Sequence, residues 1–261
     1  YAYNIGGKWT NPKNLNNPIN TMHWETQPSF SSDGKTLYFV RGLKTRGGIK
    51  NQDIYTSELS EGGTWSIPER LSEVVNTVGR EESVFIHPDG KTLYFSSDGH
   101  VGMGGLDIYM TQKDENGVWS TPVNLGYPIN TFNDENSLLV DAEGNFAYFA
   151  SDREGGFGSL DLYKFKLPEN IKPNMVTYLA GKVYDAETKE VLPARFELID
   201  LKTGKMAIQS YADEKTGAYL VCLPINQDYA LNVSQEGYMF HSENFTLTGG
   251  TVTQPFEKNV G

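Results

Sequence analysis

The chain has 261 residues and a formal net charge of −11, from 22 Lys and Arg against 33 Asp and Glu. This acidic balance argues against nucleic acid as a partner and against an anionic membrane surface, because both attract clustered basic residues. No apolar run approaches the roughly 18–20 residues that cross a bilayer, so we expect no direct membrane insertion.

The composition favours short strands over helices. The chain contains 27 Gly, 15 Tyr and 13 Phe, and sustained helical periodicity is hard to find. Such a pattern is typical of an all-β protein with many turns. The single cysteine, Cys222, lies in the alternating run Ala218–Leu223 and is expected to be a buried thiol without a catalytic role.

One phrase is repeated three times within residues 1–167. Each copy opens on W-[TS]-x-P-x-x-L, continues through Asn-Thr with a Glu four residues later, and closes on Asp-[Ile/Leu]-Tyr. The repeat spacing is 56 residues and then 54. The repeated residues include Trp9, Trp65 and Trp119, then Glu25, Glu81 and Glu135, then Asp53, Asp107 and Asp161. A period near 50 residues that is built from short strands predicts a β-propeller blade or a related array.

Each copy is expected to supply four strands. In the first copy these are Gln27–Phe30, Thr36–Val40, Asp53–Leu59 and a segment around Trp65, with a Gly-rich loop over Arg41–Gln52. Propellers usually have about 4–8 blades, so three recognisable blades predict a partial propeller. We therefore expect more blades upstream of residue 1.

The wording of the repeat resembles a known family. "SSDGKTLYF", "HPDGKTLYFSSDG" and "ASDREGGFGSLDLY" resemble the WD40-like propeller repeats of the TolB type. The pattern W-S-x-P-x-N-L-G-x-x-I-N-T, followed by D-E, is similar to outer-membrane-protein-A-family lipoproteins of Bacteroidota. This resemblance covers about residues 1–167.

The repeat ends after Leu167. Residues 168–175, "PENIKPNM", contain two prolines and are expected to form a linker. Residues 176–261 then alternate apolar and polar positions in short runs, which predicts a β-sandwich. The phrase "GKVYDAETKEVLPA", with the later "TGAYLVCLP", resembles the carboxypeptidase-regulatory-like, transthyretin-like module over about residues 177–247.

These resemblances imply a role in the bacterial envelope. In the similar lipoproteins, a peptidoglycan-binding domain follows the propeller and the sandwich, and some members tie the type IX secretion machinery to the cell wall. The resemblance therefore implies a non-enzymatic scaffold that is periplasmic and outer-membrane-associated. Its expected partners are envelope or secretion-system proteins, with peptidoglycan bound only through a domain absent from this chain.

Motifs for catalysis, cofactors or metals are not found in the sequence. The four histidines are isolated, and there is no G-x-S-x-G elbow, P-loop or dinucleotide fingerprint. No arginine recurs at a fixed offset where it would hold a substrate carboxylate. We therefore expect no catalytic residue, no cofactor and no metal. Two alternatives stay open: a glycan- or peptide-acting propeller enzyme with its catalytic residues outside this chain, and a ligand- or cation-binding propeller.

Acidic residues next to glycines could be cation ligands or turn caps. For Asp98 and Asp152 we favour hydrogen bonds to backbone N–H groups within their own Gly-rich turns over a calcium loop. The recurring Glu25, Glu81 and Glu135 could form a ring of channel carboxylates. We favour the alternative in which each caps its neighbouring Asn-Thr turn.

Residues that differ between the copies are better candidates for function. The expected loop face carries a candidate partner-binding rim of Trp24, Arg41, Arg80, His100, Met103, Arg153 and Phe157. Exposed aromatic, Met and Arg side chains are typical of protein interfaces. Ordinary loop divergence is the alternative explanation.

Overall fold

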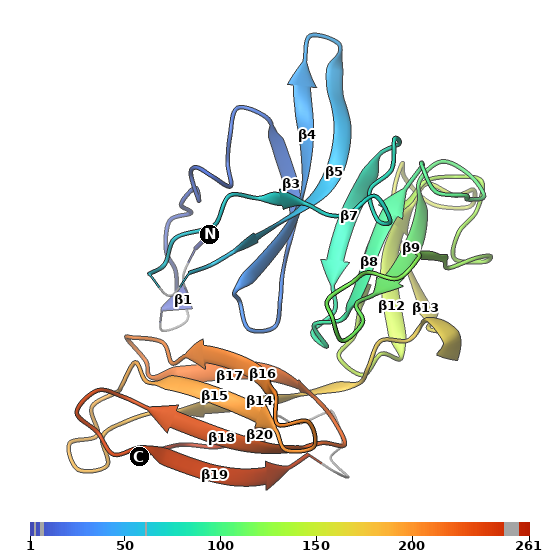
Figure 1. Cartoon of the computed structure of the whole chain (residues 1–261). Coiled ribbons are helices and arrows are strands. Elements are labelled where there is room, and N and C mark those ends of the chain that lie inside the picture. Colours follow the sequence, from blue (N-terminus) through green and yellow to red (C-terminus); the bar gives the residue numbers. More distant parts are fainter. Residues whose placement is uncertain (3, 6–7, 61, 248–255) are drawn as a thin grey trace.

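The computed structural model of the chain describes residues 1–2, 4–5, 8–60, 62–247 and 256–261. The fold is all-β, with five sheets of three or four strands and a short pair, β1 (Asn4–Ile5) with β2 (Lys8–Trp9). None of these sheets is closed (Figure 1). A search of the described residues for helices long and apolar enough to cross a membrane finds none.

The three copies of the repeat build three antiparallel sheets. The first has the order β3 (Trp24–Phe30), β4 (Thr36–Thr45), β5 (Gly48–Glu58) and β6 (Glu69–Arg70). The second has the order β7 (Glu81–Ile86), β8 (Thr92–Ser97), β9 (Asp107–Gln112) and β10 (Val123–Asn124). The third contains β11 (Glu135–Val140), β12 (Phe146–Ser151) and β13 (Asp161–Lys166).

The outer strands differ from the prediction. Trp65 forms only an isolated bridge with Leu59, and the fourth strand is β6, at Glu69–Arg70. This strand belongs to the motif that opens the second copy. The first and second sheets are therefore each completed by residues of the following copy. The third sheet is followed by the chain beyond Leu167, which does not repeat the phrase, and it has three strands where we expected four.

The predicted loop over Arg41–Gln52 is also wrong. Strands β4 and β5 continue to Thr45 and Gly48, and they pair as far as those two residues. The additional residues of the first copy therefore extend a β-hairpin. Figure 1 shows this hairpin projecting beyond the other sheets.

The second sheet lies between the other two (Figure 1). All six residues of β8 are buried, because both faces of the strand are covered. One face packs Phe95 against Val40 and Ile54 of the first sheet, and the other packs Tyr94 with Phe149 of the third sheet. The edge strands β3, β7 and β11 lie next to one another. Along β12, buried residues alternate with residues that are exposed or half-buried, as expected for a strand covered on one face only.

Two further sheets form the C-terminal half and enclose their own core. One has the order β17 (Ala218–Pro224), β14 (Val176–Lys182) and β20 (Phe256–Glu257). The other has the order β16 (Met206–Tyr211), β15 (Arg195–Asp200), β18 (Asp228–Ser234) and β19 (His241–Thr246). Side chains from both sheets, among them Phe196, Tyr219 and Leu231, pack between them. Residues 248–255 of this predicted region lie outside the described residues.

The segment between the two halves is docked on the repeat sheets. It contains a single 3₁₀ turn, η1 (Glu169–Ile171), and Ile171 is buried. The hydroxyl of Tyr94 donates to the carbonyl of Ile171 at 2.8 Å, and the backbone N–H of Asn174 donates to Asp89 at 3.0 Å. The predicted linker is therefore held by buried groups of the second sheet.

Asp89 is the centre of this docking contact. Its carboxylate also accepts the backbone N–H groups of Lys91 and Thr92, at 2.9 and 2.8 Å. Burial acts to raise the pKa of Asp89, but the contact with His87 and these two N–H groups outweigh it and lower the pKa. Asp89 therefore stabilises the folded state in its ionised form.

We predict that Asp89→Asn lowers the unfolding free energy at pH 7 by about 1–3 kcal/mol. The folded pKa is depressed, so the stabilisation is present above the unfolded-state pKa of about 3.9 and is lost as pH falls through the folded value. Urea unfolding between pH 7 and pH 2 should show a shallower acid loss in the variant than in the natural chain. Asp33→Asn, at the equivalent position of the first copy, is the matched control. An unchanged acid profile in Asp89→Asn would contradict the assignment.

Candidate functional site

The Asn-Thr dipeptide of each copy forms a turn that the following Glu closes. Thr77 donates its backbone N–H to Glu81 Oε2 at 3.0 Å and its hydroxyl to Oε1 at 2.6 Å. The same two bonds join Thr21 to Glu25 and Thr131 to Glu135. Glu81 and Glu135 are fully buried, so their oxygens face donors of the chain itself. In all three copies the carboxylate therefore caps its own Asn-Thr turn.

The Asn of the dipeptide joins the turn to the sheet of the preceding copy. Asn76 Oδ1 accepts the backbone N–H of Ile54 at 2.7 Å, and Asn76 Nδ2 donates to the Ile54 carbonyl at 3.0 Å. Asn130 makes the same pair of bonds with Ile108. Each side chain thus imitates a peptide group next to a third strand, which fixes one sheet against the next.

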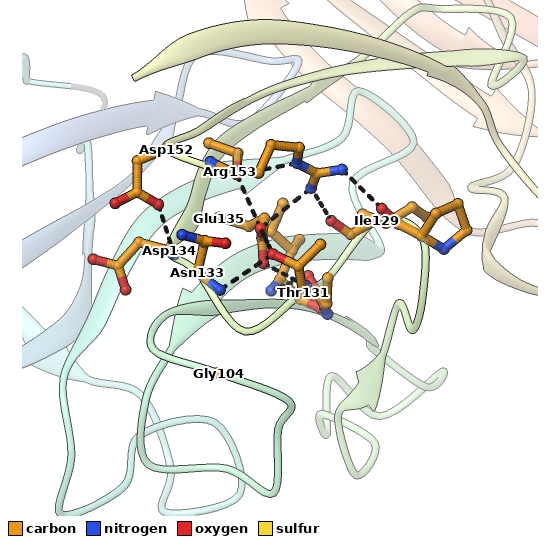
Figure 2. A network of polar contacts seen from close by, with 12 residues as sticks. Gly104, Ile129, Thr131, Asn133, Asp134, Glu135, Asp152 and Arg153 are labelled. Carbon is orange, nitrogen blue, oxygen red and sulfur yellow. Dashed lines mark hydrogen bonds and ion pairs between the residues drawn. The ribbon is translucent and has the colours of Figure 1, made fainter. Parts of the chain in front are cut away.

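Arg153 completes this network in the third copy (Figure 2). Its Nη2 lies 3.2 Å from Glu135 Oε1. The guanidinium also donates to the carbonyls of Pro128 and Ile129, at 2.9 and 2.5 Å. Its side chain is only 18% exposed. Arg153 is therefore part of the packing of the turn.

Arg41 and His100 occupy the equivalent place in the other two copies. Arg41 Nη2 donates to the Ile19 carbonyl at 2.9 Å, and Arg41 Nε lies 3.0 Å from Glu25 Oε1. His100 Nε2 lies 2.9 Å from the Val75 carbonyl. Ile19, Val75 and Ile129 are the same residue of the repeat, so the carbonyl at this position accepts from a basic side chain in every copy.

The three basic side chains also stack on equivalent aromatic pairs. The guanidinium carbon of Arg153 lies 4.9 Å from the ring centre of Phe149 and 4.8 Å from that of Tyr163. Arg41 lies over Phe39 and Tyr55, and the ring of His100 packs against Phe95 and Tyr109. A cation over such rings adds roughly 0.5–2 kcal/mol. We call this arrangement the basic seat of each copy.

The sequence did not reveal the basic seat. The separation between the basic residue and the carbonyl is 22 residues for Arg41, 25 for His100 and 24 for Arg153. In each copy a basic side chain therefore reaches the same place from a different position of the repeat. An arginine at a fixed offset would have been visible in the sequence, but these positions differ between the copies. Of the candidate rim, Arg41 and Arg153 are only 14% and 18% exposed, because both take part in the packing.

The remaining rim residues fall into two classes. Trp24 was expected to be exposed, but it is half-buried and packs against the core between the first and second sheets. Arg80 is 47% exposed and pairs with Asp98, with Nε 2.7 Å from Oδ2. Met103 and Phe157 are exposed as expected. The structure thus leaves Arg80, Met103 and Phe157 at the surface.

The acidic residues of the Gly-rich loops organise the loops. Asp98 and Asp152 accept the backbone N–H groups of Arg80 and Asp134, at 2.6 and 3.1 Å. The donors belong to the neighbouring turn, whereas we had expected donors within the same loop. Asp107 accepts the N–H of Met103 at 2.7 Å. A search of the described residues finds no group of three His, Cys, Asp or Glu placed to hold a metal.

The lone cysteine does not have the properties of a nucleophile. Cys222 is half-buried on β17, and burial raises the pKa of its thiol to about 11. A thiol with such a pKa is protonated at neutral pH, and the thiol form is a poor nucleophile. The prediction that Cys222 is buried was wrong, because the buried face of β17 carries Tyr219, Val221 and Leu223, and Cys222 lies on the opposite face.

Exposed apolar side chains recur on the loop face. We define the loop face by the turns at residues 20–24, 76–80 and 130–134 and by the loops at residues 98–106 and 152–160. The residue after each Asn-Thr is apolar and 71–106% exposed, namely Met22, Val78 and Phe132. Met103 and Phe157 each lie four positions before the Asp that closes their copy, and they are 50% and 103% exposed. The first series was visible in the sequence as one apolar residue after every Asn-Thr, but it was not recognised.

No protein-family model matches the chain, and no curated protein matches it. Among solved structures, the chain is similar to an α-L-arabinofuranosidase from Lactobacillus brevis, with 14% identity and a TM-score of 0.40 over 91% of this chain and 72% of that one. It is also similar to AofleA from Arthrobotrys oligospora, with 8% identity and a TM-score of 0.32 over 92% and 78% of the two chains.

The basic seat should contribute more to stability than a surface ion pair. Arg153→Ala removes the partner of a fully buried carboxylate, so we predict a loss of about 3 kcal/mol in the unfolding free energy. Arg80→Ala breaks an exposed pair and should cost less than about 1 kcal/mol. Urea unfolding followed by tryptophan fluorescence measures both. Equal losses in the two variants would contradict a structural role that is specific to Arg153.

Proposed function

We propose that the protein is a non-enzymatic interaction scaffold of the bacterial periplasm, associated with the outer membrane. In this proposal the three repeat sheets are blades of a β-propeller, and the C-terminal pair of sheets is a transthyretin-like sandwich. Its partners are envelope or secretion-system proteins, bound through the loop face, and its role is to link their complex to the cell wall. The resemblance of the repeats to outer-membrane-protein-A-family lipoproteins supports the cellular setting.

One observation carries the binding role: the apolar series on the loop face. Met22, Val78 and Phe132 stand at the same position of each copy, yet they make little contact with the core. A position that packing does not require, but that stays apolar in all three copies, is better explained by an external contact. Met and aromatic side chains are also enriched in protein interfaces.

The loop face is held rigidly behind these side chains. Gly104 lies so close to the Phe132 backbone that an added Cβ would come within 2.4 Å of the Phe132 carbonyl carbon. The N–H of Leu106 donates to Asp134 Oδ1 at 2.8 Å, which ties the loop of one copy to the turn of the next. A preorganised surface loses little conformational entropy when it binds a partner.

We predict that the triple variant Met103→Ser, Phe132→Ser and Phe157→Ser loses most of its partner contacts without loss of stability. All three side chains are exposed, so their removal should change the unfolding free energy by less than about 0.5 kcal/mol each. Crosslinking in envelope extracts, followed by quantitative mass spectrometry, measures the contacts against the natural chain.

The matched control is Ile67→Ser, Val118→Ser and Val123→Ser, on or just before the outer strands β6 and β10, where the side chains are 46–81% exposed. It should retain the crosslinked partners. The proposal fails if the loop-face variant captures the same proteins as the natural chain, or if both triple variants lose them equally.

A further inference from the structure

A recess of about 470 Å³ lies between the innermost strands of the three repeat sheets. It is lined by the same stretch of each copy, residues 27–30 of β3, 83–86 of β7 and 137–139 of β11, together with Pro88. We call it the inner groove. Its volume falls within the roughly 300–1,000 Å³ that is usual for ligand sites. None of the residues that line it takes part in the loop-face contacts described above.

The inner groove is bordered by three equivalent irregularities of the backbone. Gln27, Ser83 and Ser137 have φ values of 53, 55 and 57°, in the left-handed region that favours glycine. At each of them the pairing register with the neighbouring strand shifts, so these residues fall outside the regular ladders. Such a conformation costs about 1–3 kcal/mol per residue and clusters at ligand sites. The conformation is kept in all three copies although the residue type changes.

The lining of the inner groove is uncharged. Its residues are apolar, or are serine, proline and glutamine, in a chain with a net charge of −11. By contrast, a second cavity, next to strands β15, β16 and β17, is lined by charged groups that include Asp33, Lys91 and Asp200. A charged ligand would find no countercharge in the inner groove, whereas a neutral, partly apolar one loses little on leaving water.

A buried hydroxyl in the inner groove has no partner. Ser83 is 3% exposed, and its Oγ makes no hydrogen bond to the part of the chain that the structure describes. An unsatisfied buried polar group costs about 1–3 kcal/mol, so such groups are rare without a role. A ligand that offers one hydrogen-bonding group would satisfy it.

The strand edges indicate what kind of ligand fits. Strands β3, β7 and β11 are each the terminal strand of their sheet. The N–H of Ile86 on β7 donates to Ser29 Oγ on β3 at 3.1 Å, so this amide is already paired and a bound peptide would use other edge groups of these strands. Unpaired edge groups can add an extended peptide as a further strand, with its side chains in neighbouring pockets.

We propose that the inner groove binds an extended, uncharged peptide segment, which hydrogen-bonds to Ser83 Oγ and lays apolar side chains against Phe30 and Leu139. Both of these side chains are half-exposed at the border of the groove. This site is separate from the loop face and does not depend on the function proposed above.

A phage-displayed library of linear heptapeptides, selected on the whole chain, tests the proposal. Selected peptides should be poor in charged residues. Affinities are then measured by fluorescence anisotropy for the natural chain, Ser83→Ala and Leu139→Glu. We expect about a fivefold loss for Ser83→Ala, the size of one neutral hydrogen bond, and at least a tenfold loss for Leu139→Glu. Met22→Ser, on the loop face, is the control and should bind unchanged.

Stability separates a ligand role from a structural one. Ser83→Ala removes an unsatisfied group, so its melting temperature should equal or exceed that of the natural chain while its peptide affinity falls. The proposal is overturned if the library yields no enriched peptide, if the enriched peptides are charged, or if they bind Ser83→Ala and Leu139→Glu as tightly as the natural chain. It is also overturned if the affinity loss of Ser83→Ala is accompanied by a lower melting temperature.

Discussion

The three repeat sheets depend on a buried carboxylate at the start of each innermost strand. Glu81 and Glu135 are completely removed from water, and an ionised carboxylate in that position is tolerated only when it is hydrogen-bonded or paired. The Thr of the preceding turn supplies two donors, and the serine on the adjacent strand supplies a third, as Ser97 and Ser151 do at 2.8 and 2.9 Å. The basic seat then ties the same turn to aromatic side chains. Each junction between sheets is thus specified by polar groups, while the apolar faces supply most of the burial.

Much of this architecture follows from the sequence, because the groups that build it recur at constant spacing. The three-fold repeat, the strands that follow its Gly turns and the turn-capping position of Glu135 could all be inferred from residue types. The basic seat could not be inferred, because only the position of a basic side chain in space is repeated, and neither its residue type nor its place in the sequence is. In the first copy Arg41 reaches it from β4, whereas in the third copy Arg153 reaches it from a loop. In the second copy an added Cβ on Gly99, the residue equivalent to Arg153, would lie 1.8 Å from Thr77 Oγ1, and His100 takes the place.

The hairpin and the connecting segment show why local patterns mislead at junctions. The Gly-rich sequence between Arg41 and Gln52 is typical of a loop, yet β4 and β5 stay paired as far as Thr45 and Gly48 at the tip of the hairpin. The prolines of residues 168–175 suggested a linker, but Ile171 and Asn174 contact buried groups far away in sequence. Both outcomes depend on tertiary partners that a local pattern does not record.

The repeated Glu serves the packing of the sheets, and in the first and third copies it does so together with an arginine. A double-mutant cycle with Glu135→Gln, Arg153→Met and the combined variant tests this most directly, by urea unfolding at pH 7. We expect each single variant to be destabilised and the two changes to be coupled by about 1–3 kcal/mol, because the side chains share one buried network. Additive losses, with no coupling, would contradict it.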